Sequence, residues 1–263
     1  MTLRLPVHFV FTPLGNTVDV SSPGLCRRAH NIRCSSGKST RRPQNVEGEF
    51  YVDRSCIDCD VCRWMAPNSF KRVDGQSAVY KQPKDPRERL AALQALLSCP
   101  TASIRTETPP SDILEAHATF PIPINEESIP GVYHCGYHSE KSFASSSYFI
   151  RRTGGNILVD RDDVADHNLW QKHFKCPRII HELEVTADTA NVEIKLEGSG
   201  PWDFLGPDID LIFTPGHTEG SVCLHLKPLK VLFTGDHLAN SGKGFLNVDP
   251  IYNWYSGTLK AVA

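Results

Sequence analysis

Four cysteines in this chain have the spacing of residues that hold an iron–sulfur cluster. Cys56, Cys59 and Cys62 are separated from one another by two residues each, and Cys99, followed by Pro100, lies further along the chain. Two intervening residues let a loop turn so that successive thiolates reach different irons of one cubane cluster, and a remote cysteine supplies the fourth ligand. The spacing predicts one 4Fe–4S cluster bound by these four thiolates.

The residues after Cys62 indicate that the chain holds one cluster and not two. When a chain binds two clusters, the run of three cysteines continues with three residues and a Cys-Pro pair, whose cysteine binds the other cluster. Here that position is Ala66, followed by Pro67. A zinc site is the alternative, because four-cysteine zinc modules also use C-x-x-C pairs. Zinc sites rarely combine three evenly spaced cysteines with a distant Cys-Pro pair, which favours the cluster.

Two short strands and one helix are expected to position these cysteines. Alternating apolar residues predict a strand within 47–55, and a second strand is predicted at 77–83, after the turn signal Asp74-Gly75. The helix is predicted at 87–98, where leucines recur at three- and four-residue steps and give one apolar face. The Cys-Pro pair then ends the helix.

The segment "CIDCDVCRWMAPNSF", with "DGQSAVYKQP" and "ALLSCPTASI" after it, resembles a bacterial-type single-cluster 4Fe–4S ferredoxin. The resemblance covers residues 47–108 and implies a small α+β ferredoxin-like module there. It also implies that the cluster serves electron transfer or redox sensing. Trp64, close to Cys62, is expected to shield the cluster by packing.

The composition of the chain changes after residues 109–130, a proline-rich stretch that predicts a linker. From Gly131 onward, runs of strand-forming residues are broken by Gly and Asp, and one helix-like stretch lies near 163–174. In this part, "DLIFTPGHTEGSV" and "VLFTGDHL" resemble the metallo-β-lactamase superfamily, as do "GVYHCGYHSEKSFASSSYFIRR" and "GNILVD". The fold that the resemblance implies is a four-layer αβ/βα sandwich, here incomplete, over residues 131–263.

The same resemblance implies a metal site that holds zinc or iron. His217 of the P-G-H-T loop matches a metal ligand of the family, and Asp236 of T-G-D matches the carboxylate that bridges two metals. The family's main ligand run is H-x-H-x-D-H, and in the nearest match, "RDDVADH", Asp166 and His167 fill the closing D-H pair. Metals held in this way lower the pKa of a bound water and create hydroxide for hydrolysis.

Two imidazoles of that run are replaced, because Asp162 and Val164 stand at the two first His positions. In the family, a helix and a strand separate the "ILVD" strand from the run, whereas here Asp160 directly precedes Arg161. A further P-G-H-type histidine is expected beyond the last residue. We therefore expect an incomplete domain, produced by an internal deletion such as a skipped exon or by a faulty gene prediction.

Residues 1–46 form a basic leader with seven Lys or Arg, one acid and many Ser and Thr. Since the whole chain carries a net charge of −2, the rest carries −8. An Arg- and Ser-rich, acid-poor leader is typical of an organelle transit peptide, and its hydroxyl content favours the plastid (chloroplast) stroma over the mitochondrion. The alternative is an ordinary basic tail. In either case residues 1–46 are expected to be disordered and to lie outside the core.

The acidic remainder of the chain gives no reason to expect a nucleic acid as partner, because phosphate binding needs a positive surface. It suits docking to a basic redox partner protein through long-range attraction. No apolar run approaches the ~20 residues that a membrane-spanning helix needs, so no membrane segment is expected. The five other cysteines are scattered, unlike a secreted disulfide framework, which favours a reducing compartment.

Three functions are compatible with these features. The first is an iron–sulfur protein of the metallo-hydrolase/oxidoreductase type, whose cluster serves electron transfer or redox sensing. The second is a metal-dependent hydrolase of a small-molecule substrate, in which the cluster is structural. The third is a shortened variant without catalytic function.

Overall fold

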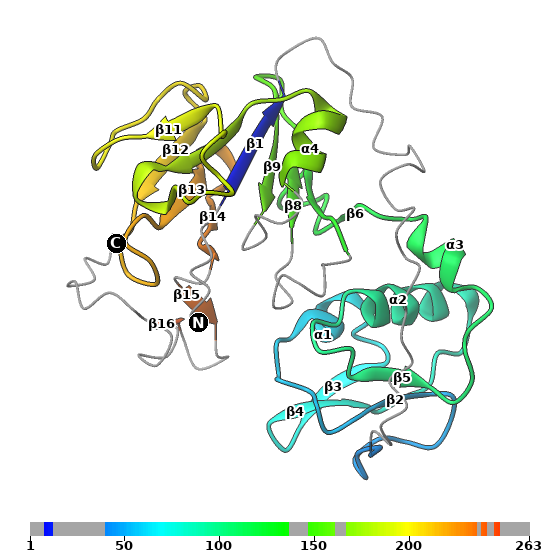
Figure 1. Ribbon diagram of the computed structural model, residues 1–263. Coiled ribbons are helices and arrows are strands. Elements are labelled where there is room, and N and C mark those ends of the chain that lie inside the picture. The colour runs from blue at the N-terminus through cyan, green and yellow to red at the C-terminus, as the bar shows by residue number, and fades with distance from the viewer. Residues whose placement is uncertain are drawn as a thin grey trace. The chain divides into compact units, whose positions relative to one another are not determined.

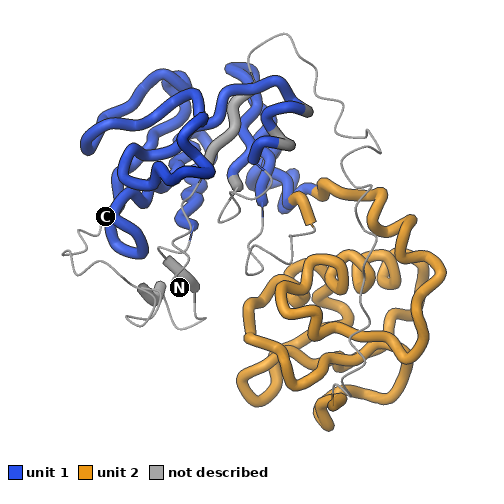
Figure 2. Tube along the Cα trace, in the orientation of Figure 1, with its two compact units in different colours: residues 1–18, 123–134, 139–263 blue, residues 19–122, 135–138 orange. Residues whose placement is uncertain are grey.

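The computed structural model describes residues 8–12, 40–136, 147–160, 167–235, 238–240 and 245–247 (Figure 1). The chain divides into two units, which Figure 2 shows in different colours. Unit 1 comprises Met1–Val18, Pro123–His134 and Ser139–Ala263, and unit 2 comprises Asp19–Ile122 and Cys135–His138. Unit 2 therefore carries the four predicted cluster cysteines, and unit 1 carries the predicted ligands of the second metal site.

Unit 2 combines two short antiparallel ladders with helices, in keeping with the predicted α+β module. Strand β2 pairs with β5, and β3 forms a hairpin with β4 around the predicted Asp74-Gly75 turn. Phe50, Phe70 and Leu93 are each at most 2% exposed and form the centre of its core. The elements are β2 (Phe50–Val52), α1 (Val61–Met65), β3 (Phe70–Val73), β4 (Gln76–Val79), α2 (Pro86–Leu97), β5 (Ile104–Thr106) and α3 (Ile113–His117).

Helix α2 forms where the leucine pattern predicts it. The side chain of Asp85 accepts a hydrogen bond of 2.9 Å from the backbone N–H of Glu88, which caps the first turn. Pro86 lies in that first turn, where backbone N–H groups have no partner within the helix, so the missing N–H of proline costs no hydrogen bond. The helix ends at Leu97, so that its C-terminal end places Cys99 beside the other cysteines.

The module begins earlier than residue 47. Arg42 is 4% exposed, and its guanidinium donates to the carbonyl of Val73 at 2.9 Å and to that of Ser77. The side-chain oxygen of Asn45 accepts from the backbone N–H groups of Val52 and Val79, each at 2.9 Å, and so ties β2 to β4. The predicted boundary is wrong here because these contacts are between residues far apart in sequence, which a local pattern does not show.

The module also ends later than residue 108, within the expected linker. Helix α3 packs on α2, and its Ala116 is fully buried in the core of unit 2. Arg89 of α2 binds both Glu49, at 2.7 Å, and Asp112, which precedes α3. Hydrogen bonds from Arg89 hold the pKa of Asp112 below its usual value. The first part of 109–130 is therefore an ordered part of the module.

Unit 1 is mostly sheet. One sheet has the strand order β11-β10-β1-β9-β8-β7-β6, a second has β12-β13-β14, and β15 pairs with β16. Its strands are β1 (His8–Thr12), β6 (Ile122–Pro123), β7 (Val132–His134), β8 (Tyr148–Ile150), β9 (Asn156–Asp160), β10 (Arg178–His181), β11 (Ile194–Leu196), β12 (Ile209–Phe213), β13 (Val222–Leu226), β14 (Val231–Phe233), β15 (Leu238–Asn240) and β16 (Phe245–Asn247). Among the described residues of unit 1, the one α-helix is α4 (His167–Phe174), close to the predicted stretch.

The first two sheets of unit 1 share one hydrophobic core. Ile157 and Ile179 from the large sheet and Leu211 and Leu224 from the small one belong to a single cluster of buried side chains. Two sheets that pack face to face in this way are part of what the sandwich prediction requires. The four layers of that prediction are not assembled in the described residues, so the full arrangement stays a prediction. No described helix is long and apolar enough to cross a membrane.

The expectation of a wholly disordered leader is wrong for residues 8–12. They form β1, which pairs antiparallel with β9 from His8↔Asp160 to Thr12↔Asn156 and with β10 on its other side. The sequence "HFVFT" is rich in β-branched and aromatic residues, which favour a strand. β1 lies between β9 and β10, so it is an interior strand of the large sheet. The rest of the leader before residue 40 lies outside the described residues.

Deleting residues 1–12 is expected to destabilise unit 1 and to leave unit 2 intact. The deletion would expose the backbone N–H and C=O groups of β9 and β10 that now pair with β1. We expect the midpoint of thermal unfolding of unit 1 to fall by roughly 5 °C or more. Differential scanning calorimetry of the full chain and of the deletion variant measures this shift. An unchanged transition of unit 1 would show that β1 contributes nothing to the sheet.

Candidate metal centre

A tight loop carries Cys56 and Cys59 and leads into α1, which carries Cys62. Between them, Asp58 and Asp60 adopt left-handed backbone conformations, with φ of 62° and 72°. Aspartate is among the few residues with side chains that enter this region readily. Arg63, in the first turn of α1, binds Asp58 at 2.7 Å and also contacts Asp60. This ion-pair network fixes the turn of the loop from which the cysteines project.

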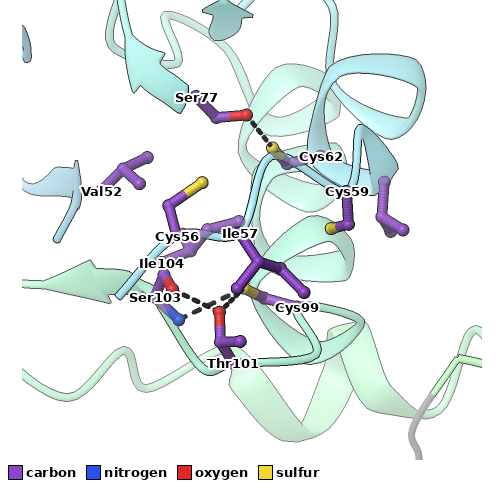
Figure 3. Close-up of a pocket in the computed structure, with 11 residues that line it drawn as sticks. Val52, Cys56, Ile57, Cys59, Cys62, Ser77, Cys99, Thr101, Ser103 and Ile104 are labelled. Atoms are coloured by element: carbon purple, nitrogen blue, oxygen red, sulfur yellow. Dashed lines mark hydrogen bonds between the residues drawn. The ribbon is translucent and has the colours of Figure 1, made fainter. Parts of the chain in front are cut away.

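All four predicted ligands line one pocket of unit 2. Figure 3 shows their thiols arranged around it. Cys62 is buried, Cys56 and Cys99 are half-buried, and Cys59 is exposed. The structure therefore brings together the four cysteines that the spacing singled out. The other lining residues are Val52, Ile57, Val61, Ser77, Thr101, Ser103 and Ile104.

The donor set fits an iron–sulfur cluster. Four thiols are the ligands of a cubane cluster, and apolar walls with few polar groups suit its burial. Among the described residues, no three His, Cys, Asp or Glu side chains lie close enough to hold a single metal ion.

Burial keeps the thiols of Cys59 and Cys62 protonated in the absence of metal. It raises the pKa of the Cys62 thiol to about 12, although the hydrogen bond with Ser77 opposes the shift. It likewise raises the pKa of Cys59 to about 11. Cys59 is exposed as a residue, but its thiol faces the pocket, where neighbouring side chains remove it from water. Iron must therefore displace these protons when it binds.

Two polar groups next to the thiols were not predicted from the sequence. The Oγ of Ser77 lies 3.2 Å from the Sγ of Cys62, and the backbone N–H of Ser103 donates to the Sγ of Cys99 at 3.2 Å (Figure 3). Ser103 follows Cys99 by only four residues, so the sequence could have indicated that its backbone lies near this sulfur. Ser77 approaches Cys62 through the β3–β4 hairpin, and no local pattern indicates that contact.

Trp64 does not have the predicted shielding role. Its side chain is 38% exposed and is not among the residues that line the pocket. The residues that do wall the pocket are aliphatic, chiefly Ile57, Val61 and Ile104. Trp64 is two residues after Cys62 in α1. Because residues two apart in a helix point to different faces, Trp64 does not point toward the pocket that Cys62 lines.

The predicted second metal site is only partly described. Asp166 and Asp236 lie outside the described residues. His167 opens α4, is 2% exposed, and has its Nδ1 3.3 Å from a guanidinium nitrogen of Arg178. Burial, together with this guanidinium, lowers the pKa of His167, which favours the neutral imidazole. A guanidinium so close also opposes a second cation at that nitrogen.

His217 lies half-buried in the loop between β12 and β13. Two hydrogen bonds fix the conformation of this loop. The backbone N–H of Gly216 donates to the carbonyl of Thr218 at 3.0 Å, and the backbone N–H of Gly220 donates to the carboxylate of Glu184 at 2.6 Å. The two described histidines do not belong to any group of three ligand side chains among the described residues. These residues alone do not form a metal site, and the four-ligand set stays a prediction.

Comparison with known families identifies two classes of domain in the chain. Residues 52–106 match the 4Fe-4S single cluster domain of Ferredoxin I, and residues 164–262 match the metallo-beta-lactamase superfamily. The chain therefore joins a single-cluster ferredoxin domain to a metallo-β-lactamase-superfamily domain, as the two resemblances predicted. The second match begins at Val164, so it does not include the strands at 131–160.

A short stretch of the chain is also similar to a curated protein. The hydroxyacylglutathione hydrolase of Rhizobium meliloti (strain 1021) is 51% identical over 45 residues. That stretch covers 17% of this chain and 18% of the relative, so the chain matches less than a fifth of the relative's length. No solved structure gives a significant match to the chain.

Proposed function

We propose that this chain is an iron–sulfur protein of the metallo-hydrolase/oxidoreductase type, in which unit 2 serves electron transfer or redox sensing. The observation that carries the proposal is the single pocket lined by Cys56, Cys59, Cys62 and Cys99. A 4Fe–4S cluster bound there supplies one-electron redox chemistry. The four thiolates would hold it, and the aliphatic walls of the pocket would keep water away from it.

The exposure of the ligand loop suits exchange of electrons with another molecule. Cys59 is exposed, and Ile57 beside it has 61% of its surface in solvent. An exposed apolar side chain next to a ligand gives a partner protein a place to approach the cluster edge. We propose a basic redox partner protein, and the plastid stroma, or alternatively the mitochondrion, as the compartment. The acidic remainder of the chain supports the basic partner. The basic, hydroxyl-rich leader supports the compartment, and removal of the whole leader on import would also remove β1 from the sheet of unit 1.

A metal-dependent hydrolase with a structural cluster is the second candidate. The match of residues 164–262 to the metallo-beta-lactamase superfamily and the partial identity to a hydroxyacylglutathione hydrolase support it. The superfamily match implies zinc or iron, with Asp166, His167, His217 and Asp236 as candidate ligands. A hydroxyacylglutathione is then the first substrate to assay.

Reversible reduction of the reconstituted full chain distinguishes the two candidates. An electron carrier or sensor is expected to lose visible absorbance and gain an electron paramagnetic resonance signal on reduction with dithionite, and to recover its absorbance on reoxidation. Several cycles without loss of iron are expected. A cluster that is not reduced, or that breaks down in the first cycle, would favour the structural role.

A further inference from the structure

The buried ligand Cys62 has a polar partner on a different element. Its Sγ lies 3.2 Å from the Oγ of Ser77, which is on β4 and is 1% exposed (Figure 3). The family match and the predicted ligand set assign no role to Ser77. Because Ser77 is buried, the partners of its hydroxyl come from the protein and not from bulk water.

The second partner of Ser77 fixes the direction of the hydrogen bond. Arg63 donates from its Nη1 to the Oγ of Ser77 at 2.7 Å. A guanidinium only donates, so the serine oxygen is the acceptor in that bond and its own proton is left for another atom. A thiolate that binds iron has no proton to give. In the cluster-bound protein, the hydroxyl of Ser77 must therefore donate to the Sγ of Cys62.

The surrounding charges keep this arrangement in place. Arg63 is held by Asp58 and Asp60, and Arg72 also binds Asp58, at 2.6 Å. On the backbone side, the guanidinium of Arg42 donates to the carbonyl of Ser77. The serine is thus positioned by two arginines, and its hydroxyl is polarised by one of them.

We propose that Ser77, polarised by Arg63, is a positioning residue that raises the reduction potential of the cluster by donating a hydrogen bond to Cys62. A cluster with four thiolates is an anion, and reduction adds a further negative charge to it. A donor aimed at a ligand sulfur stabilises the reduced form more than the oxidised form, and such bonds are among the determinants of the potential. This inference rests on the proposed function of unit 2 as a redox-active iron–sulfur domain.

The test is the midpoint potential of the full chain, reconstituted anaerobically, measured by voltammetry with iron and sulfide content determined on the same samples. Ser77→Ala is expected to shift the reduction equilibrium about tenfold toward the oxidised form, which is about 59 mV for one electron. Ser77→Thr keeps the hydroxyl and is expected to stay close to wild type.

Ser69→Ala is the matched control. Ser69 lies in the same unit and is also 1% exposed, and its hydroxyl has no hydrogen-bond partner among the described residues. Ser69→Ala removes a serine hydroxyl, as Ser77→Ala does, but this hydroxyl does not contact a predicted ligand. The midpoint potential of the cluster is therefore expected to be unchanged. Equal potentials in Ser77→Ala and Ser69→Ala would overturn the inference.

A second variant covers the case in which Ser77→Ala does not retain the cluster. Arg63→Gln leaves Ser77 in place but removes the charge that polarises it, so a lower potential is again expected. An unchanged potential in Arg63→Gln would then overturn the inference. Absence of a cluster from the wild-type chain would instead refute the proposed function, because the potential has no meaning without it.

Discussion

The Cys99→Ser variant is expected to lose its iron–sulfur cluster. Cys99 is the predicted remote ligand, it lines the pocket just after the end of α2, and its sulfur accepts a hydrogen bond from the N–H of Ser103. A serine hydroxyl is a hard and weakly acidic ligand, whereas iron–sulfur clusters select soft thiolates. We expect the iron and sulfide bound per chain to fall roughly 10–100-fold, which is the loss of metal affinity typical when even a residue that supports a metal ligand is replaced.

The matched control for this variant is Cys223→Ser. Cys223 is a buried cysteine of β13 in unit 1, far in sequence from the pocket residues, and it contacts the hydroxyl of Thr214 at 3.3 Å. A serine can keep that contact, and the number of thiols falls by one in both variants. Full cluster content is expected in Cys223→Ser. Full cluster content in Cys99→Ser would contradict the ligand assignment.

Unit 1 is expected to be a poor hydrolase as it stands. In the run that matches H-x-H-x-D-H, Asp162 and Val164 replace two imidazoles. A metal held by fewer ligands is bound weakly, and the water that it should convert to hydroxide is not positioned. Restoring a family-type segment between Asp160 and Asp166, with its helix, strand and two histidines, is expected to raise kcat/KM for a hydroxyacylglutathione. The expected gain is 10–100-fold or more.

The control for the hydrolase prediction is His217→Ala in both backgrounds. His217 is the described candidate ligand in the loop between β12 and β13, and its loss is expected to abolish activity in the restored protein. Steady-state assays with zinc or iron added to the metal-depleted proteins measure the effect. Equal turnover by the natural and the restored chain, abolished in both by His217→Ala, would show that the replaced histidines are not needed.

The parts of the site that follow local rules could be predicted from the sequence. The cysteine spacing identified the four cysteines that line the pocket, and the leucine repeat located α2 to within a residue at either end. The Asp74-Gly75 turn indicated the β3–β4 hairpin. In each case the signal and the structure it specifies lie within a few residues of each other.

The parts that depend on contacts across the chain could not be predicted in this way. Ser77 reaches Cys62 only because a hairpin folds back on α1. Asn45 and Arg42 join unit 2 through bonds to strands that follow them in the sequence. The pairing of β1 with β9 joins residues almost 150 positions apart. The basic, hydroxyl-rich composition of residues 1–46 hides the short strand that they contain. Tertiary pairing therefore overrode the compositional prediction.

The most direct test of the central claim is the content of iron, acid-labile sulfide and zinc in the full chain purified without oxygen. The account predicts about four irons and four sulfides per chain, the content of one cubane cluster. It also predicts that Cys99→Ser removes both together. A wild-type chain that contains zinc and no sulfide, and loses that zinc in Cys99→Ser, would contradict the account.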